Sequence, residues 1–117
     1  MRVYIICPVR ILTDDTKAVL DRYVADLEAA GVTVHYPPRD VDQNDPIGLD
    51  IIHAHREAMQ AADEVHIYWA EKSEGSRFDL GMAFALRKPI RLINRLDLVL
   101  TPHKSFANIV LCLDDRA

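Results

Sequence analysis

The stretch from Trp69 to Leu86, WAEKSEGSRFDLGMAFAL, concentrates residue types that bind anions and do chemistry. Ser73, Gly75 and Ser76 follow an apolar run and precede a segment of helical composition. The first amides of a helix are unpaired and its dipole favours negative charge, so this turn could hold a phosphate or a sugar hydroxyl. Asp79 then places a carboxylate at the mouth of the same helix, where packing alone needs only a cap.

A structural role explains the same residues. Ser76 followed three residues later by Asp79 fits a capping box, in which the serine caps the helix and the carboxylate reaches back to the serine amide. Ser73 and Gly75 are common in any tight turn from strand to helix. The loop is neither a Walker motif nor a G-x-G-x-x-G motif, so it leaves both interpretations open.

The elements that must position this loop follow from hydrophobic periodicity. Short apolar runs rich in β-branched and aromatic residues predict four strands, over residues 3–7, 32–36, 65–69 and 90–93. Helical spacing predicts a helix capped by Thr13 and stopped by Gly31, then helices over residues 51–63 and 76–87. Residues 37–48 form a loop rich in Pro and Asp. The tail is compatible with a short helix, a fifth strand at residues 109–113, or both.

Alternating strands and helices of these lengths predict a doubly wound α/β fold, with a mostly parallel sheet of four to five strands and helices on both faces. Ligands bind such sheets beyond the carboxyl ends of the strands, near the switch point. The loops after the first three strands should therefore line one cleft. They carry Arg10, then Arg39 and Asp40, then residues 73–79.

Length and composition restrict the class of protein. The 117 residues suffice for one domain, which we assign to residues 1–117, and leave no room for a second. The formal net charge of −4, without a basic stripe, argues against a nucleic-acid polymer as partner. The start of the chain contains no signal peptide or membrane span, so we expect a cytoplasmic protein.

The cysteines and most of the histidines give no sign of a metal or a disulfide framework. Cys7 and Cys112 lie in apolar runs and are expected to be buried, reduced thiols. Four of the histidines have no spacing typical of a metal site: His35, His53, His66 and His103. We therefore expect neither a metal nor a cofactor.

Three stretches together resemble a known family. They are VYIICPVR near the start, HREAMQAADEVHIYW in the middle, and SEGSRFDLGMAFALRKPI, the most specific of the three. The pattern S-x-G-x-x-[FY]-[DE]-L-G-x-A-x-A after a strand is similar to the nucleoside 2-deoxyribosyltransferase family, which includes deoxynucleoside 5'-monophosphate N-hydrolases. The resemblance covers most of the chain.

The resemblance implies a catalytic pair. The carboxylate before LG, at Asp79, is the nucleophile on the anomeric carbon in that family, where the residue is usually Glu. A helper acid, usually Asp, falls on His55, and histidine can protonate a leaving base near neutral pH. A histidine on a helix face that is satisfied by a neighbour is the alternative for His55.

The resemblance also implies a substrate site. Ser73 and Arg10 would contact a 5'-phosphate, although Ile11 and Leu12 replace the glycines that follow that arginine in the family. The remaining substrate-binding residues expected are Cys7, Arg39, Asp40, Gly75, Ser76 and Ser105. Arg39 and Asp40 would face the base, or else form a solvated turn. Ser105 would close the phosphate site across a homodimer.

The function implied is cleavage or transfer at the N-glycosidic bond of a small nucleoside or its 5'-monophosphate. A non-catalytic nucleotide-binding module of the same fold is the alternative, because Asp79 and His55 both depart from the family's usual residues. A response-regulator receiver needs an acceptor Asp at the end of the third strand, where Trp69 stands instead.

Overall fold

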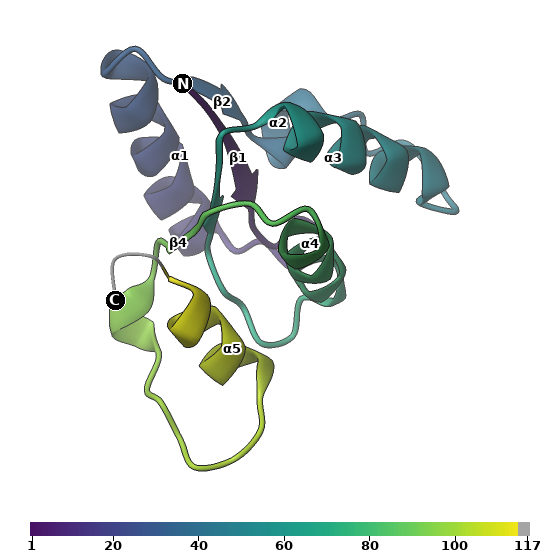
Figure 1. The fold of residues 1–117 in the computed structure, drawn as a ribbon. Helices are drawn as coiled ribbons and strands as arrows, with labels where there is room; N and C mark the ends of the chain where they lie inside the picture. The colour runs from purple at the N-terminus through teal and green to yellow at the C-terminus, as the bar shows by residue number, and fades with distance from the viewer. Residues whose placement is uncertain (115–117) are drawn as a thin grey trace.

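The computed structural model describes residues 1–114, which form one parallel sheet of four strands in the order β2-β1-β3-β4. The strands are β1 (Arg2–Ile6), β2 (Thr33–His35), β3 (Glu64–Ile67) and β4 (Ile90–Leu92). The helices are α1 (Asp14–Ala29), α2 (Pro37–Asp40), α3 (Leu49–Ala61), α4 (Glu74–Ala85), the 3-10 turn η1 (Arg95–Asp97) and α5 (Phe106–Leu113). Figure 1 shows α1 on one side of the sheet and α3 and α4 on the other. The doubly wound α/β fold predicted from the sequence is confirmed.

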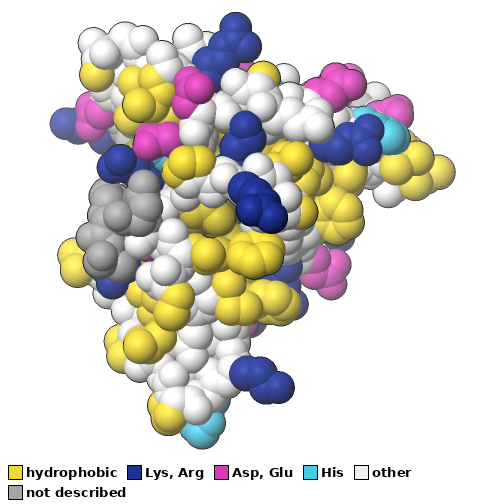
Figure 2. Space-filling view, viewed as in Figure 1, with side chains coloured by type: hydrophobic (Ala, Val, Ile, Leu, Met, Phe, Trp, Pro, Cys, Tyr) yellow, Lys and Arg dark blue, Asp and Glu magenta, His cyan; other side chains and the backbone are white. Residues whose placement is uncertain are grey.

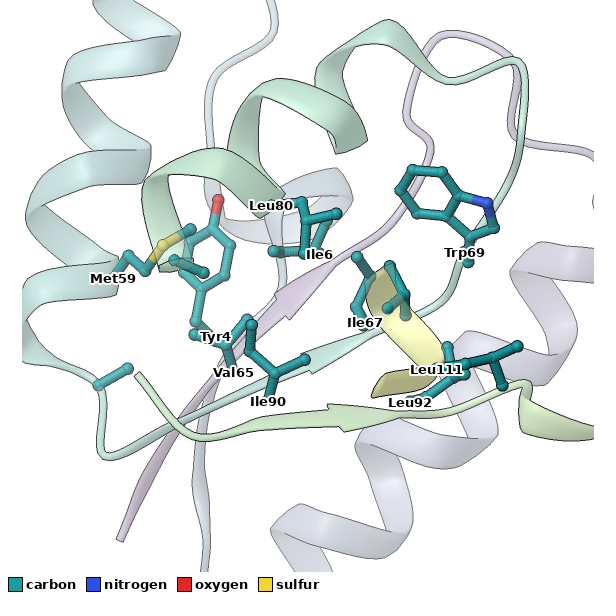
Figure 3. Close-up of a cluster of buried hydrophobic side chains, with 13 residues drawn as sticks. Tyr4, Ile6, Met59, Val65, Ile67, Trp69, Leu80, Ile90, Leu92 and Leu111 are labelled. Carbon is teal, nitrogen blue, oxygen red and sulfur yellow. The ribbon is translucent and has the colours of Figure 1, made fainter. Parts of the chain in front are cut away.

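Both faces of the sheet are buried, which explains why its strands are continuous apolar runs. Val3 and Ile5 of β1 pack under α1, with Leu20 and Val24 of that helix. The alternate β1 residues belong to the opposite cluster, drawn in Figure 3, which includes Met59 of α3 and Leu80 of α4. Because side chains alternate along a strand, β1 contributes to both cores.

The connections place a switch point at the middle of the sheet. From β1 the chain passes through α1 to β2 on one side, and β3 then pairs with β1 on the other. Thr13 caps α1 by accepting a hydrogen bond from the Thr16 amide at 3.2 Å, and Gly31 follows the helix with a φ of +88°, as predicted. The carboxyl ends of β1 and β3 therefore lie side by side where a ligand site is expected.

The fifth strand considered for residues 109–113 is wrong, because that segment belongs to α5. A continuous apolar run fits a buried helix as well as a strand, and here Ser105 supplies an N-cap. A single parallel bridge between Ile90 and Asp114 extends the sheet edge. The predicted loop over residues 37–48 also contains the short helix α2, which begins at Pro37. Cys7 is buried as expected, but Cys112 is exposed.

Candidate active site

The N-terminus of α4 is capped by Ser73, so the capping box considered as the structural alternative for Ser76 and Asp79 is wrong. The Ser73 hydroxyl oxygen accepts from the Ser76 amide at 3.3 Å and lies 2.8 Å from the Ser76 hydroxyl. The helix starts at Glu74, earlier than the predicted Ser76, and Asp79 falls in its second turn. Asp79 therefore has no capping role, and its contacts need another explanation.

Asp79 is a buried carboxylate with two side-chain partners from other elements. Its side chain reaches the inner face of the sheet, where the residue is only 4% exposed. The Tyr4 hydroxyl of β1 donates to Asp79 Oδ2 at 3.2 Å. His55 Nδ1 of α3 lies 3.2 Å from Asp79 Oδ1 and 3.0 Å from Oδ2. The structure thus brings together Asp79 and His55, the two catalytic candidates from the sequence, and adds Tyr4.

Tyr4 is held as a neutral hydrogen-bond donor. Figure 3 shows its ring within the core cluster and its hydroxyl directed toward α4. Burial, and then the charge of Asp79, raise the pKa of the Tyr4 hydroxyl well above its ordinary range. A phenol that keeps its proton can only donate to the carboxylate or accept from another group, so it fixes one Asp79 oxygen without adding a second negative charge.

Two imidazole nitrogens beside Tyr4 have no partner among the described residues. They are His55 Nε2 and His35 Nε2, both buried atoms. The His35 ring stacks on Tyr4 with centroids 5.2 Å apart, and the His55 ring meets Tyr4 edge-on at 5.9 Å. A buried polar atom without a hydrogen bond is costly, so such atoms often mark a place where a ligand or water binds.

His35 is the functional candidate that the sequence analysis missed. Its position was set aside only because it lacked metal spacing. The sequence signal that could have identified His35 was its position at the carboxyl end of a predicted strand. Because β1 and β2 pair in parallel, His35 lies opposite Tyr4. Burial lowers the pKa of His35, so its ring is neutral near neutral pH.

The polar residues of α2 are bound to one another and to their neighbours. The Arg39 guanidinium donates to Asp40 at 2.8 Å, to Glu28 at 3.0 Å and to the Val34 carbonyl at 3.1 Å. Asp40 also accepts from the Tyr36 amide at 2.8 Å. These contacts favour the turn interpretation of Arg39 and Asp40, since a base would have to compete with them.

The other predicted binding residues lie in separate parts of the fold. Cys7 follows β1 and is buried, whereas Arg10 in the next loop is exposed. Gly75 lies in the first turn of α4, and nothing lies within 4 Å of a side chain added there, so the fold itself does not require a glycine. The Ser105 hydroxyl accepts from the Asn108 amide at 3.0 Å and caps α5. Ser105 therefore has a structural role within its own chain.

A separate hollow of about 500 Å³ lies at the carboxyl ends of β1 and β3. Pro8, Ile11, Tyr68, Trp69 and Asn94 contribute to its lining. The loops after β1 and β3 both contribute to this hollow, whereas Asp79, His55 and Ser73 do not line it.

The fold matches solved enzymes of nucleoside and nucleotide chemistry. A CMP N-glycosidase from Clostridium botulinum superimposes with a TM-score of 0.61 and 20% identity, covering 79% of this chain and 67% of that one. A 2-deoxyribosyltransferase from Bacillus psychrosaccharolyticus gives 0.63 and 16%, covering 97% and 96%. One from Leishmania mexicana gives 0.59 and 20%, covering 78% of this chain and 62% of that one, less than two thirds of its length. At these identities the likeness establishes the fold.

No protein-family model matches the sequence, and no curated protein matches it significantly. Within residues 1–114, no group of three or more His, Cys, Asp or Glu side chains is arranged to hold a metal. In the same part of the chain, no helix has both the length and the apolar character needed to cross a membrane.

The two thiols are expected to differ sharply in reactivity. Burial, and then the charge of Asp79, raise the pKa of Cys7 to about 12. At pH 8 only about one Cys7 thiol in ten thousand is then a thiolate, the form that reacts. Iodoacetamide should modify exposed Cys112 first, as followed by intact-protein mass spectrometry. Cys112→Ser should abolish the rapid reaction and Cys7→Ser should not; equal rates at both thiols would contradict the assignment.

Proposed function

We propose that this chain cleaves or transfers the N-glycosidic bond of a nucleoside, a deoxynucleoside or the corresponding 5'-monophosphate. The observation that carries the proposal is the buried Asp79 carboxylate of α4, which contacts His55 of α3 and the Tyr4 hydroxyl of β1. Breaking a glycosidic bond develops positive charge on the sugar, and a preorganised carboxylate stabilises that charge. The N-glycosidase and deoxyribosyltransferases with this fold support the same chemistry.

The family resemblance implies one route from this pair. Asp79 Oδ attacks the anomeric carbon, the bond from carbon to nitrogen breaks, and the departing base takes a proton from His55. Water or a second base then releases the sugar from the carboxylate. Asp is one methylene shorter than the Glu usual in the family, so this route requires the sugar to approach α4 more closely.

The start of α4 supports the placement of a phosphate or a sugar hydroxyl. The hydroxyl groups of Ser73 and Ser76 lie at a helix N-terminus, where they are buried and bonded to each other, and there is open space beside Gly75. Arg10 in the loop after β1 could add a charge-assisted contact. The substrate we propose is a small molecule, and the proposed reaction takes place in the cytoplasm without a cofactor or metal.

The test is a substrate panel. The purified protein is incubated with purine and pyrimidine nucleosides, deoxynucleosides and their 5'-monophosphates, and free base is measured by liquid chromatography. A second set contains an added free base, so that exchange reveals transfer. Base release or exchange supports the proposal. Tight binding measured by calorimetry, without release or exchange, would instead support the non-catalytic nucleotide-binding module.

The hydroxyl of Ser73 predicts a preference for 5'-monophosphates over free nucleosides. Ser73→Asp should erase or reverse that preference, because a carboxylate repels the phosphate dianion. Asp is as good an N-cap as Ser, so α4 should keep its stability. The ratio of kcat/KM for the two substrate classes measures the effect, and Ser73→Asn is the matched neutral cap. Equal kcat/KM values in the parent protein would contradict the prediction.

We also propose a homodimer, because exposed apolar side chains gather over α4 and α5 (Figure 2). Phe78 and Phe84 of α4 are 56% and 63% exposed, and Phe106 and Ile109 of α5 are 47% and 46% exposed. Contiguous apolar surface on a small domain is typical of an interface. Trp69, at the end of the third predicted strand, does not belong to this surface, because it is only 5% exposed.

The more specific part of the dimer proposal is that the two subunits share their active sites. If Ser105 completes the neighbour's phosphate site, mixing Asp79→Asn with Ser105→Gly subunits restores one intact site in each mixed dimer. Because about half of the dimers are mixed after random exchange and each has one intact site of two, about a quarter of the parent activity should return. Gly is chosen because it costs an N-cap only a few tenths of a kcal/mol. Light scattering measures the mass. A monomer, or activity no higher than the mean of the two variants, would count against shared sites.

A further inference from the structure

The contacts of Asp79 determine which atoms of the pair are available to a substrate. Both carboxylate oxygens lie within 3.2 Å of His55 Nδ1, and Oδ2 also accepts from the Tyr4 hydroxyl. The residue is 4% exposed. A nucleophilic carboxylate needs a free oxygen aimed at the anomeric carbon, and misplacement by about 1 Å can cost a hundredfold in rate. With its oxygens bonded in this way, Asp79 is better placed to orient His55 than to attack the sugar.

The available atom belongs to His55. Its Nδ1 faces the carboxylate and, in the neutral ring, donates its hydrogen there, which leaves Nε2 as an unprotonated acceptor. Nε2 is buried and has no partner among the described residues, although the residue as a whole is 8% exposed. An imidazole fixed at Nδ1 by a carboxylate, with Nε2 directed at the reacting group, is the arrangement of a general base and its orienting acid.

We propose that His55 Nε2 is the general base of a hydrolysis in which water attacks the sugar directly and Asp79 is the positioning residue. The water gives a proton to Nε2 as its oxygen bonds to the anomeric carbon. The bond from that carbon to the base nitrogen breaks, its electron pair stays on the nitrogen, and the nitrogen takes a proton from solvent. The imidazolium, paired with Asp79, then returns its proton to solvent.

This inference rests on the proposed function and favours direct attack by water over attack by Asp79. A single displacement inverts the anomeric carbon, whereas attack by Asp79 followed by water retains its configuration. It also predicts hydrolysis over base exchange, since no covalent sugar intermediate waits for a second base.

The deciding experiment uses the parent protein and the monophosphate from which it releases base fastest, in water containing methanol. Methanol competes with water, and the methyl glycoside keeps its configuration for analysis by NMR. From a β-nucleotide we expect the α-methyl glycoside. The β product, or a sugar adduct on Asp79 seen by mass spectrometry with a 2'-fluoro substrate, would overturn the inference and leave the proposed function standing. Absence of base release from every substrate would instead reject the proposed function, and the inference with it.

Two further measurements keep the test independent of folding. Nitrogen-15 NMR of the parent protein should show His55 protonated at Nδ1, and protonation at Nε2 alone would overturn the proposal. Asp79→Glu should lower kcat at least tenfold with little change in KM, because the longer side chain displaces the imidazole. If Asp79 were the nucleophile, this return to the family's usual residue would preserve or raise kcat. Thermal unfolding monitors the fold, and Glu74→Gln in the exposed first turn of α4 is the matched control.

Discussion

Asp79→Asn is expected to lower kcat for base release by about a thousandfold or more, within the range found when the orienting carboxylate of a histidine is neutralised. Asn keeps the size of Asp79 and a carbonyl oxygen. It cannot stabilise the imidazolium, and its amide nitrogen can meet His55 Nδ1 and favour the wrong tautomer. Because KM reports contacts made elsewhere in the site, it should change little. Steady-state kinetics with the most rapidly cleaved substrate gives both values.

The burial of Asp79 changes the stability expected for this variant. An exposed position at a helix start would cost about 1 kcal/mol. Here the side chain accepts bonds from two buried groups, so the loss is on the order of 2 kcal/mol. Chemical denaturation measures it, and Glu74→Gln serves as the control. Unchanged kcat in a folded Asp79→Asn protein would remove Asp79 from the mechanism by either route.

The sheet and its covering helices were predictable because the periodicity of the sequence records burial directly. Strand runs such as residues 3–7 are apolar throughout since both faces of the sheet are covered. The same rule fails at residues 109–113, where α5 lies over the core cluster and carries apolar residues on most of its surface. Periodicity does not separate a short buried helix from a buried strand, and the cap at Ser105 was the distinguishing signal.

The sequence predicted two residues of the candidate site, Asp79 and His55, but not Tyr4 and His35. Asp79 and His55 lie 24 residues apart in the chain, and only the resemblance connected them before the structure did. Tyr4 was missed because it lies within an apolar strand, where an aromatic ring is expected to be core, and His35 was missed because it was considered only as a metal ligand. Their proximity depends on strand pairing, which sets His35 beside Tyr4. Arg39 is a different case, because its charge suggested either a ligand contact or a solvated turn, and in the structure it is bonded to Glu28 and Asp40.

His55→Gln is expected to reduce kcat by about a hundredfold to ten-thousandfold, the usual contribution of a general base. Gln can still donate to Asp79 from its amide, so the buried carboxylate keeps a partner. It has no nitrogen that takes a proton from water. The matched control is His53→Gln, an exposed histidine on the same helix that contacts Arg56. That variant should have the parent kcat.

The relation between the two variants provides the stronger test. Residues that act as one unit are not additive, so the double variant Asp79→Asn/His55→Gln should be about as slow as the slower of the two single variants. Independent roles would multiply the two losses. His55→Gly offers a complementary measurement, since added imidazole can occupy the space left by the side chain and recover part of the rate. Failure of imidazole to rescue, together with multiplicative losses, would contradict the role of His55 as the base, and attack on the sugar by Asp79 would then be the route that the two variants support.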